Sequence, residues 1–223
     1  STPGPSPATG TPVNFDEPIE SELNEDGIWQ GALTVTAPTT TLFFVSTYGD
    51  ADLTMSIKGQ GMNDIYSYDR SEIFATFTTN PSDPAIAARL EPGEYQIELQ
   101  SFSYEDSSFM LETFAATEIS TGETLLEGTE LGPEEGWRAH FLTTNIPSAG
   151  EWEFDIVTTS GEVSLGVFGT KSKLPKSSSG STAGKGSEKD PNIVTYLDAE
   201  TTLVIVQEKT FQPFDATLTV TAL

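Results

Sequence analysis

Five carboxylates lie close together in the first third of the chain, and carboxylate oxygens are ligands that Ca²⁺ prefers. They are Asp50, Asp52, Asp64, Asp69 and Glu72. Their spacing is not that of an EF-hand loop. Two interpretations stay open: a calcium site that includes Asp50, Asp52 and Glu72, or a turn in which the carboxylates accept backbone N–H bonds. Calcium is the one cofactor that the residues suggest, because no cluster of His and Cys favours zinc or a redox metal.

Positive charge is concentrated in one segment, residues 170–191, which is rich in Ser and Gly. Half of the ten basic residues of the chain lie there, namely Lys171, Lys173, Lys176, Lys185 and Lys189. A structureless segment of this length is unusual inside a compact domain. It is either a solvated insertion or a positive arm attracted to an acidic face of a neighbouring copy or to an anionic polymer.

The chain offers little for catalysis. Its one histidine, His140, lies in a run with strand periodicity, and no nucleophile motif accompanies it. Carboxylate pairs suited to glycoside hydrolysis carry no signal either, because 34 acidic residues will always place some pair at the required distance. We therefore expect a protein that is not an enzyme, with a structural or surface role for His140.

The formal net charge of −24 sets limits on partners. Such a chain is repelled by nucleic acid and by anionic membranes, so we expect it to bind neither. No apolar stretch is long enough to insert into a membrane. The absence of Cys is compatible with an exported protein. The opening Ser1-Thr2-Pro3-Gly4 is typical of an end left after removal of an export signal, although a trimmed chain would look the same.

The sequence contains an internal repeat. Residues 90–100 align with 197–207 at an offset of 107 residues, and the register continues to Leu111/Leu218 and Thr113/Val220. Upstream, 42–49 aligns with 154–161, and Trp29 with Trp137. A repeat of this length has the size of a small domain.

Short β-branched and aromatic runs with period two, broken by turn residues, indicate strands throughout. The first half offers runs at 28–36, 41–47, 51–58, 72–79, 85–90, 94–101 and 107–115. The second offers 123–130, 136–144, 151–158, 162–168, 192–197, 201–208 and 214–221. Residues 203–206 are apolar on both faces, which predicts a central strand. We expect an all-β fold of two tandem antiparallel β-sandwiches, 24–118 and 119–223, the second carrying the 170–191 loop.

Residues 1–23 are rich in Pro, Gly and Ser and are expected to form an extended N-terminal tail. Its apolar Val13, Phe15 and Ile19 are candidates for docking along the sheet edge of a neighbouring copy by strand addition. Prolines at 12 and 18 restrict the segment to an edge position.

The order of motifs in the first half resembles the pre-peptidase C-terminal (PPC) domains of bacteria and archaea. Glycines at 27 and 31, the run 42–45, Asp52-Leu53, Glu72, the segment 90–95 and a last strand ending at Leu111 follow that family's pattern over residues 27–115. The second half looks like a diverged copy, with Gly161-Glu162-Val163 in place of the aspartates. The resemblance implies a jelly-roll-like sandwich of a secreted accessory domain. Some members bind calcium and fibrous or polymeric substrates.

Three hypotheses follow, all for an extracellular or cell-surface protein. The first is a structural homo-oligomer or homopolymer, a filament or surface layer assembled through the tail and the lysine-rich segment. The second is a monomeric module that binds an extracellular polysaccharide or fibrous protein, with or without calcium. The third, an enzyme, has the least support.

Overall fold

A computed structural model describes residues 8–48, 52–59, 62, 64–67, 83–102, 107–128, 138–161, 163–169, 190–208 and 212–223. None of these residues is helical, so no helix among them is long and apolar enough to cross a membrane. The chain divides into two compact units, Ser1–Ala115 and Ala116–Leu223.

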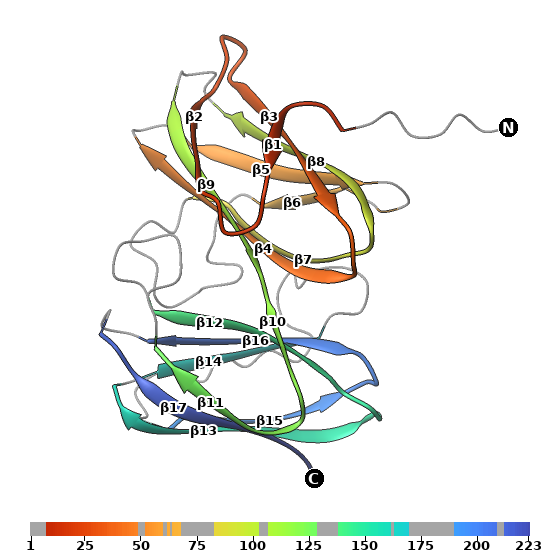
Figure 1. The fold of residues 1–223 in the computed structure, drawn as a ribbon, viewed down its shortest axis with the longest axis vertical. Helices are drawn as coiled ribbons and strands as arrows, with labels where there is room; N and C mark the ends of the chain where they lie inside the picture. Colours follow the sequence, from red (N-terminus) through yellow and green to blue (C-terminus); the bar gives the residue numbers. More distant parts are fainter. Residues whose placement is uncertain are drawn as a thin grey trace, which may run out of the picture. The chain divides into compact units, whose positions relative to one another are not determined.

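The first unit is a sandwich of two sheets (Figure 1). One sheet has the order β1-β3-β8-β5-β6 and the other β2-β9-β4-β7. The strands are β1 (Thr11–Val13), β2 (Ile19–Glu22), β3 (Ile28–Val35), β4 (Thr39–Tyr48), β5 (Leu53–Gly59), β6 (Ile65–Ser67), β7 (Ala85–Leu90), β8 (Gly93–Ser101) and β9 (Ser108–Ala115). The buried core includes Phe43, Met55 and Ile97, and Trp29 of one sheet meets Phe109 of the other edge to face at 5.3 Å.

The second unit is also a two-sheet sandwich, with orders β10-β12-β16-β14 and β11-β17-β13-β15. Its strands are β10 (Thr117–Ile119), β11 (Gly122–Glu127), β12 (Ala139–Asn145), β13 (Gly150–Ser160), β14 (Val163–Gly169), β15 (Asn192–Leu197), β16 (Thr201–Glu208) and β17 (Asp215–Ala222). Phe154, Leu165, Val204 and Leu218 pack in its core. As predicted, β16 lies centrally and is buried on both faces.

The two sandwiches match strand for strand, which confirms the predicted fold class. The β1-β3-β8-β5 order of the first recurs as β10-β12-β16-β14 in the second, and β2-β9-β4-β7 recurs as β11-β17-β13-β15. Within the described residues, β6 has no counterpart. Pairing is antiparallel except at one edge of each sandwich, where β1 joins β3 and β10 joins β12 in parallel. The two copies therefore share an unusual edge as well as their antiparallel strands.

The described part of the segment expected to be an extended N-terminal tail is part of the first sandwich. Its residues form β1 on the edge of one sheet and β2 on the edge of the other. Pro12 occupies an edge strand, the position that a residue without a backbone N–H tolerates. Val13 can approach β3 closely because Gly31 has no side chain: a Cβ there would lie 2.8 Å from Val13 Cγ2.

Strand pairing corrects the predicted register of the repeat upstream of residue 85. Phe43 pairs with Thr113 and Ile86, and Phe154 pairs with their counterparts Val220 and Ile193. Phe154 thus corresponds to Phe43 and not to Leu42. The prediction was wrong by one residue, a shift that turns every side chain to the other face of a sheet.

The same pairings assign a new counterpart to Trp29. Trp29 pairs with Leu99, and His140 pairs with Val206, which corresponds to Leu99 at the offset of 107. His140 therefore takes the place of Trp29, and the predicted match to Trp137 was wrong. Leu142 likewise takes the place of Gly31. The large Trp29 and the side-chain-free Gly31 of the first sandwich are thus replaced by His140 and Leu142, two side chains of intermediate size. The combined side-chain volume at the two positions is roughly conserved.

Candidate functional site

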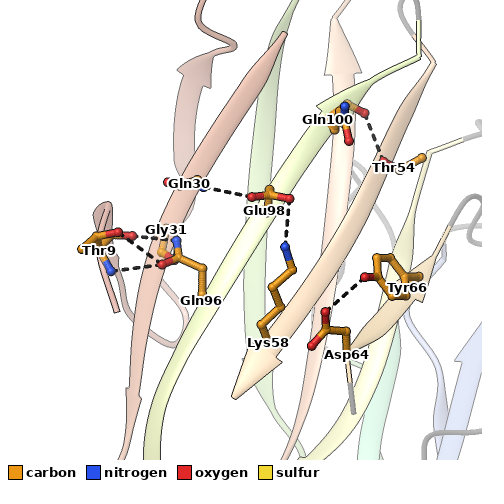
Figure 2. Close-up of polar contacts among 10 residues, drawn as sticks. All are labelled: Thr9, Gln30, Gly31, Thr54, Lys58, Asp64, Tyr66, Gln96, Glu98 and Gln100. Atoms are coloured by element: carbon orange, nitrogen blue, oxygen red, sulfur yellow. Dashed lines mark hydrogen bonds and ion pairs between the residues drawn. The ribbon is translucent and has the colours of Figure 1, made fainter. Parts of the chain in front are cut away.

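The outer face of the β1-β3-β8-β5-β6 sheet carries a set of interlinked polar side chains. Strand alternation produces this face, because β8 turns Tyr95, Ile97 and Leu99 into the core and the polar residues between them outward. The outward residues of β8 are Glu94, Gln96, Glu98 and Gln100. Neighbouring segments add polar residues beside Gln96, Glu98 and Gln100, as Figure 2 shows.

A row of three side chains crosses the middle of this face (Figure 2). Gln30 Nε2 on β3 donates to Glu98 Oε2 at 2.9 Å, and Lys58 Nζ on β5 lies 3.1 Å from Glu98 Oε1. The hydrogen bond from Gln30, together with the ammonium group of Lys58, lowers the pKa of Glu98 against the opposing effect of partial burial. Glu98 is therefore an ionised acceptor with both oxygens held in place.

Gln96 fixes the β1 end of the face. Its Oε1 accepts a bond from Thr9 N at 3.0 Å, while its Nε2 donates to Thr9 O at 2.6 Å and to Gly31 O at 3.1 Å. The amide thereby ties the segment before β1 to β8. Farther along β8, Thr34 Oγ1 donates to Glu94 Oε1 at 2.9 Å.

Tyr66 supplies the aromatic group of the face. Tyr66 lies on β6, next to Ser56, which in turn pairs with Glu98. Its ring is 43% exposed, and its Oη donates to Asp64 Oδ2 at 3.1 Å. The hydrogen bond with Asp64 raises the pKa of Tyr66, so the phenol stays protonated as a donor. At the opposite corner, Gln100 is exposed beside Thr54, whose Oγ1 donates to Gln100 O at 3.3 Å.

This arrangement can recognise a ligand through many weak polar contacts. Amides, a carboxylate, an ammonium group and a phenol lie side by side on this face, and together they supply both hydrogen-bond donors and acceptors. From Gln96 to Gln100 the polar side chains extend over about 13 Å along β8. Such a surface suits the hydroxyl groups of a polysaccharide, with Tyr66 as a ring on which a sugar can stack.

The corresponding face of the second sandwich has different chemistry. Leu203 and Ile205 replace Gln96 and Glu98, Phe141 replaces Gln30 and Phe168 replaces Lys58, as the strand pairings show. All four apolar side chains are buried. The polar outer face of the β1-β3-β8-β5-β6 sheet, called the polar face below, is therefore a property of the first copy alone.

The predicted calcium ligands are placed only in part. Asp52 is exposed just before β5, and its carbonyl accepts a bond from Phe102 N at 3.1 Å. The Asp64 carboxylate accepts the hydrogen bond from Tyr66. The other three, Asp50, Asp69 and Glu72, lie outside the described residues. Among the residues that the structure describes, no group of three or more His, Asp or Glu could hold a metal ion. The calcium site stays a prediction.

The predicted interface residues of the N-terminal segment lie within their own sandwich. Val13 is only 4% exposed, and Phe15 and Ile19 are half-buried. Ile19 pairs with Leu111 of β9, so the strand addition expected with a neighbouring copy takes place inside one chain. The five lysines from Lys171 to Lys189 lie outside the described residues.

His140 is part of the second sandwich's packing. Its ring meets Phe214 edge to face at 5.6 Å, much as Trp29 meets Phe109. Nε2 donates to Glu127 O at 2.9 Å. Burial lowers the pKa of His140, so the neutral ring is favoured. These contacts are those of a structural histidine.

A duplicated Asp-Pro pair went unnoticed in the sequence although the signal was there. Asp83-Pro84 and Asp190-Pro191 obey the same offset of 107 as the strands that follow them. Asp83 Oδ2 accepts from Thr47 N at 3.1 Å, and Asp190 Oδ1 accepts from Thr158 N at 2.7 Å and from Thr158 Oγ1 at 2.9 Å.

The prolines of the two pairs also act alike. Val45 N donates to Pro84 O at 3.1 Å, and Ile156 N donates to Pro191 O at 3.0 Å. Each Asp-Pro pair thus fastens the start of an edge strand, β7 or β15, to the long strand beside it. This is a structural device that both copies keep.

Neither a family model nor a curated protein sequence matches the chain. Among solved structures, it is similar to the pre-peptidase C-terminal domain of a collagenase from Bacillus anthracis, at 12% identity over 49% of this chain and 99% of that domain, with a TM-score of 0.38. It is also similar to a protein from Eubacterium rectale, at 11% identity over 90% of this chain and 72% of that one, with a TM-score of 0.31. One of these two structures is a domain of the family that the motifs of the first half resemble.

Proposed function

We propose that this chain is a non-catalytic extracellular module that binds a neutral polysaccharide on the outer face of β3, β8, β5 and β6. The observation that carries the proposal is the row Gln30–Glu98–Lys58 beside the exposed ring of Tyr66. Its side chains hold one another in place, so a ligand meets groups that are already oriented, and less entropy is lost on binding.

The charge of the chain favours a neutral ligand. With a net charge of −24, the protein repels anionic polymers, most strongly at low ionic strength, where the charges are least screened. Sugar hydroxyl groups need both donors and acceptors, and Glu98 with its neighbours offers both.

The state of Glu98 argues for binding without catalysis. A glycosidase needs a carboxylic acid whose pKa is raised so that it can protonate the leaving group. Gln30 and Lys58 shift the pKa of Glu98 in the opposite direction. His140, the one histidine of the chain, is packed against Phe214.

Retention on insoluble polymers tests the proposal. The full chain is mixed with cellulose, chitin, starch, xylan and fibrillar collagen, with and without a calcium chelator, and the free fraction is measured. We expect retention on at least one polysaccharide and at least about tenfold weaker binding for the Tyr66→Ala/Gln100→Ala double variant, because an aromatic contact and a hydrogen bond each contribute about 1 kcal/mol.

Tyr196→Ala is the matched control, since Tyr196 is an exposed tyrosine on a strand of the second sandwich. The proposal is wrong if no polysaccharide retains the chain, if collagen alone does, or if the double variant and the control bind equally well. Loss of binding with the chelator would additionally support the calcium prediction.

A further inference from the structure

The outer face of the β11-β17-β13-β15 sheet in the second sandwich combines negative charge with exposed apolar side chains. None of its four strands contains a lysine or an arginine. Six carboxylates point outward from it, namely Glu123, Glu127, Glu151, Glu153, Asp155 and Asp215. We call these side chains, with the apolar ones between them, the acidic face.

Four large apolar side chains lie among these carboxylates. Leu125 is 81% exposed, Tyr196 65%, Val157 51% and Val194 50%. Leu125 and Val157 flank Thr217 on neighbouring strands, while Val194 and Tyr196 pair with Glu153 and Glu151. Single exposed apolar residues are ordinary, but four on one sheet face indicate a surface that another polypeptide covers.

Two carboxylates of the acidic face are held close together by one amide. Asn192 Nδ2 donates both to Glu153 Oε1 at 2.8 Å and to Asp155 Oδ1 at 2.9 Å. Like charges on neighbouring positions of a sheet face repel one another. An incoming cation would relieve that repulsion, so the face favours a positively charged partner.

We propose that the acidic face binds the lysine-rich segment, residues 170–189, of a second copy of this chain. The segment carries five of the ten positive charges in the molecule, and Leu174 and Pro175 between Lys173 and Lys176 match a face that is both acidic and apolar. Within the part of the chain that the structure describes, nothing covers these four apolar side chains, and the lysine-rich segment of a second copy can supply the cover. The contact joins two different surfaces, so it is heterologous.

The proposal is independent of polysaccharide binding, because it involves other residues in the other sandwich. Sedimentation velocity of the full chain tests it at low ionic strength and again in about 1 M salt, where screening extends only about 3 Å. We expect a sedimentation coefficient that rises with protein concentration at low salt and stays constant at high salt. Replacing all five lysines with Ser should abolish the rise.

Charge variants then locate the receiving surface. Glu123→Gln/Glu127→Gln/Glu151→Gln should weaken association about tenfold, since each exposed ion pair contributes a factor of about two. Glu20→Gln/Glu22→Gln/Glu25→Gln removes the same charge from exposed positions of the first sandwich and should leave association unchanged. A synthetic peptide covering residues 170–190 should bind the chain whose five segment lysines are replaced with Ser, and should bind the triple-Gln version of that chain about tenfold less.

Three results would overturn the proposal. The first is a chain that sediments as a monomer at every concentration in low salt. The second is equal weakening by both triple variants, which would show that net charge alone matters. The third is a peptide that binds the five-Ser variant and its triple-Gln version with equal affinity. Unfolding curves of each variant confirm that the sandwiches remain folded.

Discussion

Removing the carboxylate of either Asp-Pro pair should destabilise the sandwich that contains it and leave the other sandwich unaffected. Asp190 accepts two hydrogen bonds from Thr158, at 2.7 and 2.9 Å, and Asp83 accepts one from Thr47 at 3.1 Å while only 4% exposed. A bond to a charged group contributes about 1.5–3 kcal/mol. The substituted chain also leaves the N–H of the partner threonine without its acceptor.

We therefore expect Asp190→Ala and Asp83→Ala each to lower the free energy of unfolding of their own sandwich by about 2–3 kcal/mol. For a domain of about 110 residues, 2 kcal/mol lowers Tm by about 9 °C. Hydrogen exchange with mass spectrometry assigns the loss to a sandwich, because Asp83→Ala should speed exchange in β4 and β7 and Asp190→Ala in β13 and β15.

Asp26→Ala, at an exposed turn, is the control and should change neither sandwich. The reasoning is refuted if either variant loses less than about 0.5 kcal/mol, the range of ordinary surface substitutions. It is also refuted if exchange accelerates mainly in the sandwich that was not changed.

Three further predictions concern the core and the polar face. Val13→Ala should destabilise the first sandwich by about 2 kcal/mol, measured in urea, because two buried methyl groups are lost, whereas Thr11→Ala on the same strand should be nearly neutral. The stability of the His140→Phe variant should depend less on acid pH than that of the original chain. The folded-state pKa of His140 is depressed, so its neutral ring stabilises the fold above a pH of about 6.5, and that stability is lost as pH falls. Equal slopes of unfolding free energy against pH for both chains below pH 6.5 would contradict this. Gln30→Ala should raise the pKa of Glu98 toward its ordinary value in a carboxyl NMR titration, and an unchanged titration would show that Gln30 does not hold that carboxylate.

Much of the fold follows from local pattern, and the register error shows where pattern fails. Residues 152–158 alternate between the core and solvent, so their orientation is readable from the sequence. Residues 41–45 are all buried, because β4 is covered on both faces, and alternation disappears there. An apolar run can then slide by one residue against its repeat without penalty, and only the hydrogen-bonded partners of Phe43 and Phe154 fix the alignment.

The strands that sequence reasoning missed are short edge strands. β1, β2, β6 and β10 contain only three or four residues each, and each pairs on one side only. These strands are ordered by pairing with their neighbours and not by local propensity, so composition predicted a tail where β1 and β2 lie. The predicted strand at 72–79 lies outside the described residues.

The polar face was within reach of the sequence, because Glu94 to Gln100 alternates polar and apolar residues. The sequence did not show which residues of other strands join it. Gln30 lies 68 positions from Glu98, and Lys58 lies 40 positions from it. Only the order β3-β8-β5 brings the three together, and a single sequence contains no direct signal of strand order. The acidic face depends in the same way on the order β11-β17-β13-β15.

Residues 11–22 close one edge of each sheet in the first sandwich. A shortened chain that begins at residue 24 would leave β3 and β9 with open rows of backbone N–H and C=O groups, and such rows invite sheet-to-sheet aggregation. Precipitation of that truncated protein would then reflect the missing cover and say nothing about natural polymerisation. Recombinant versions of the first sandwich should accordingly start no later than Thr9, whose contacts with Gln96 secure the segment that protects both edges.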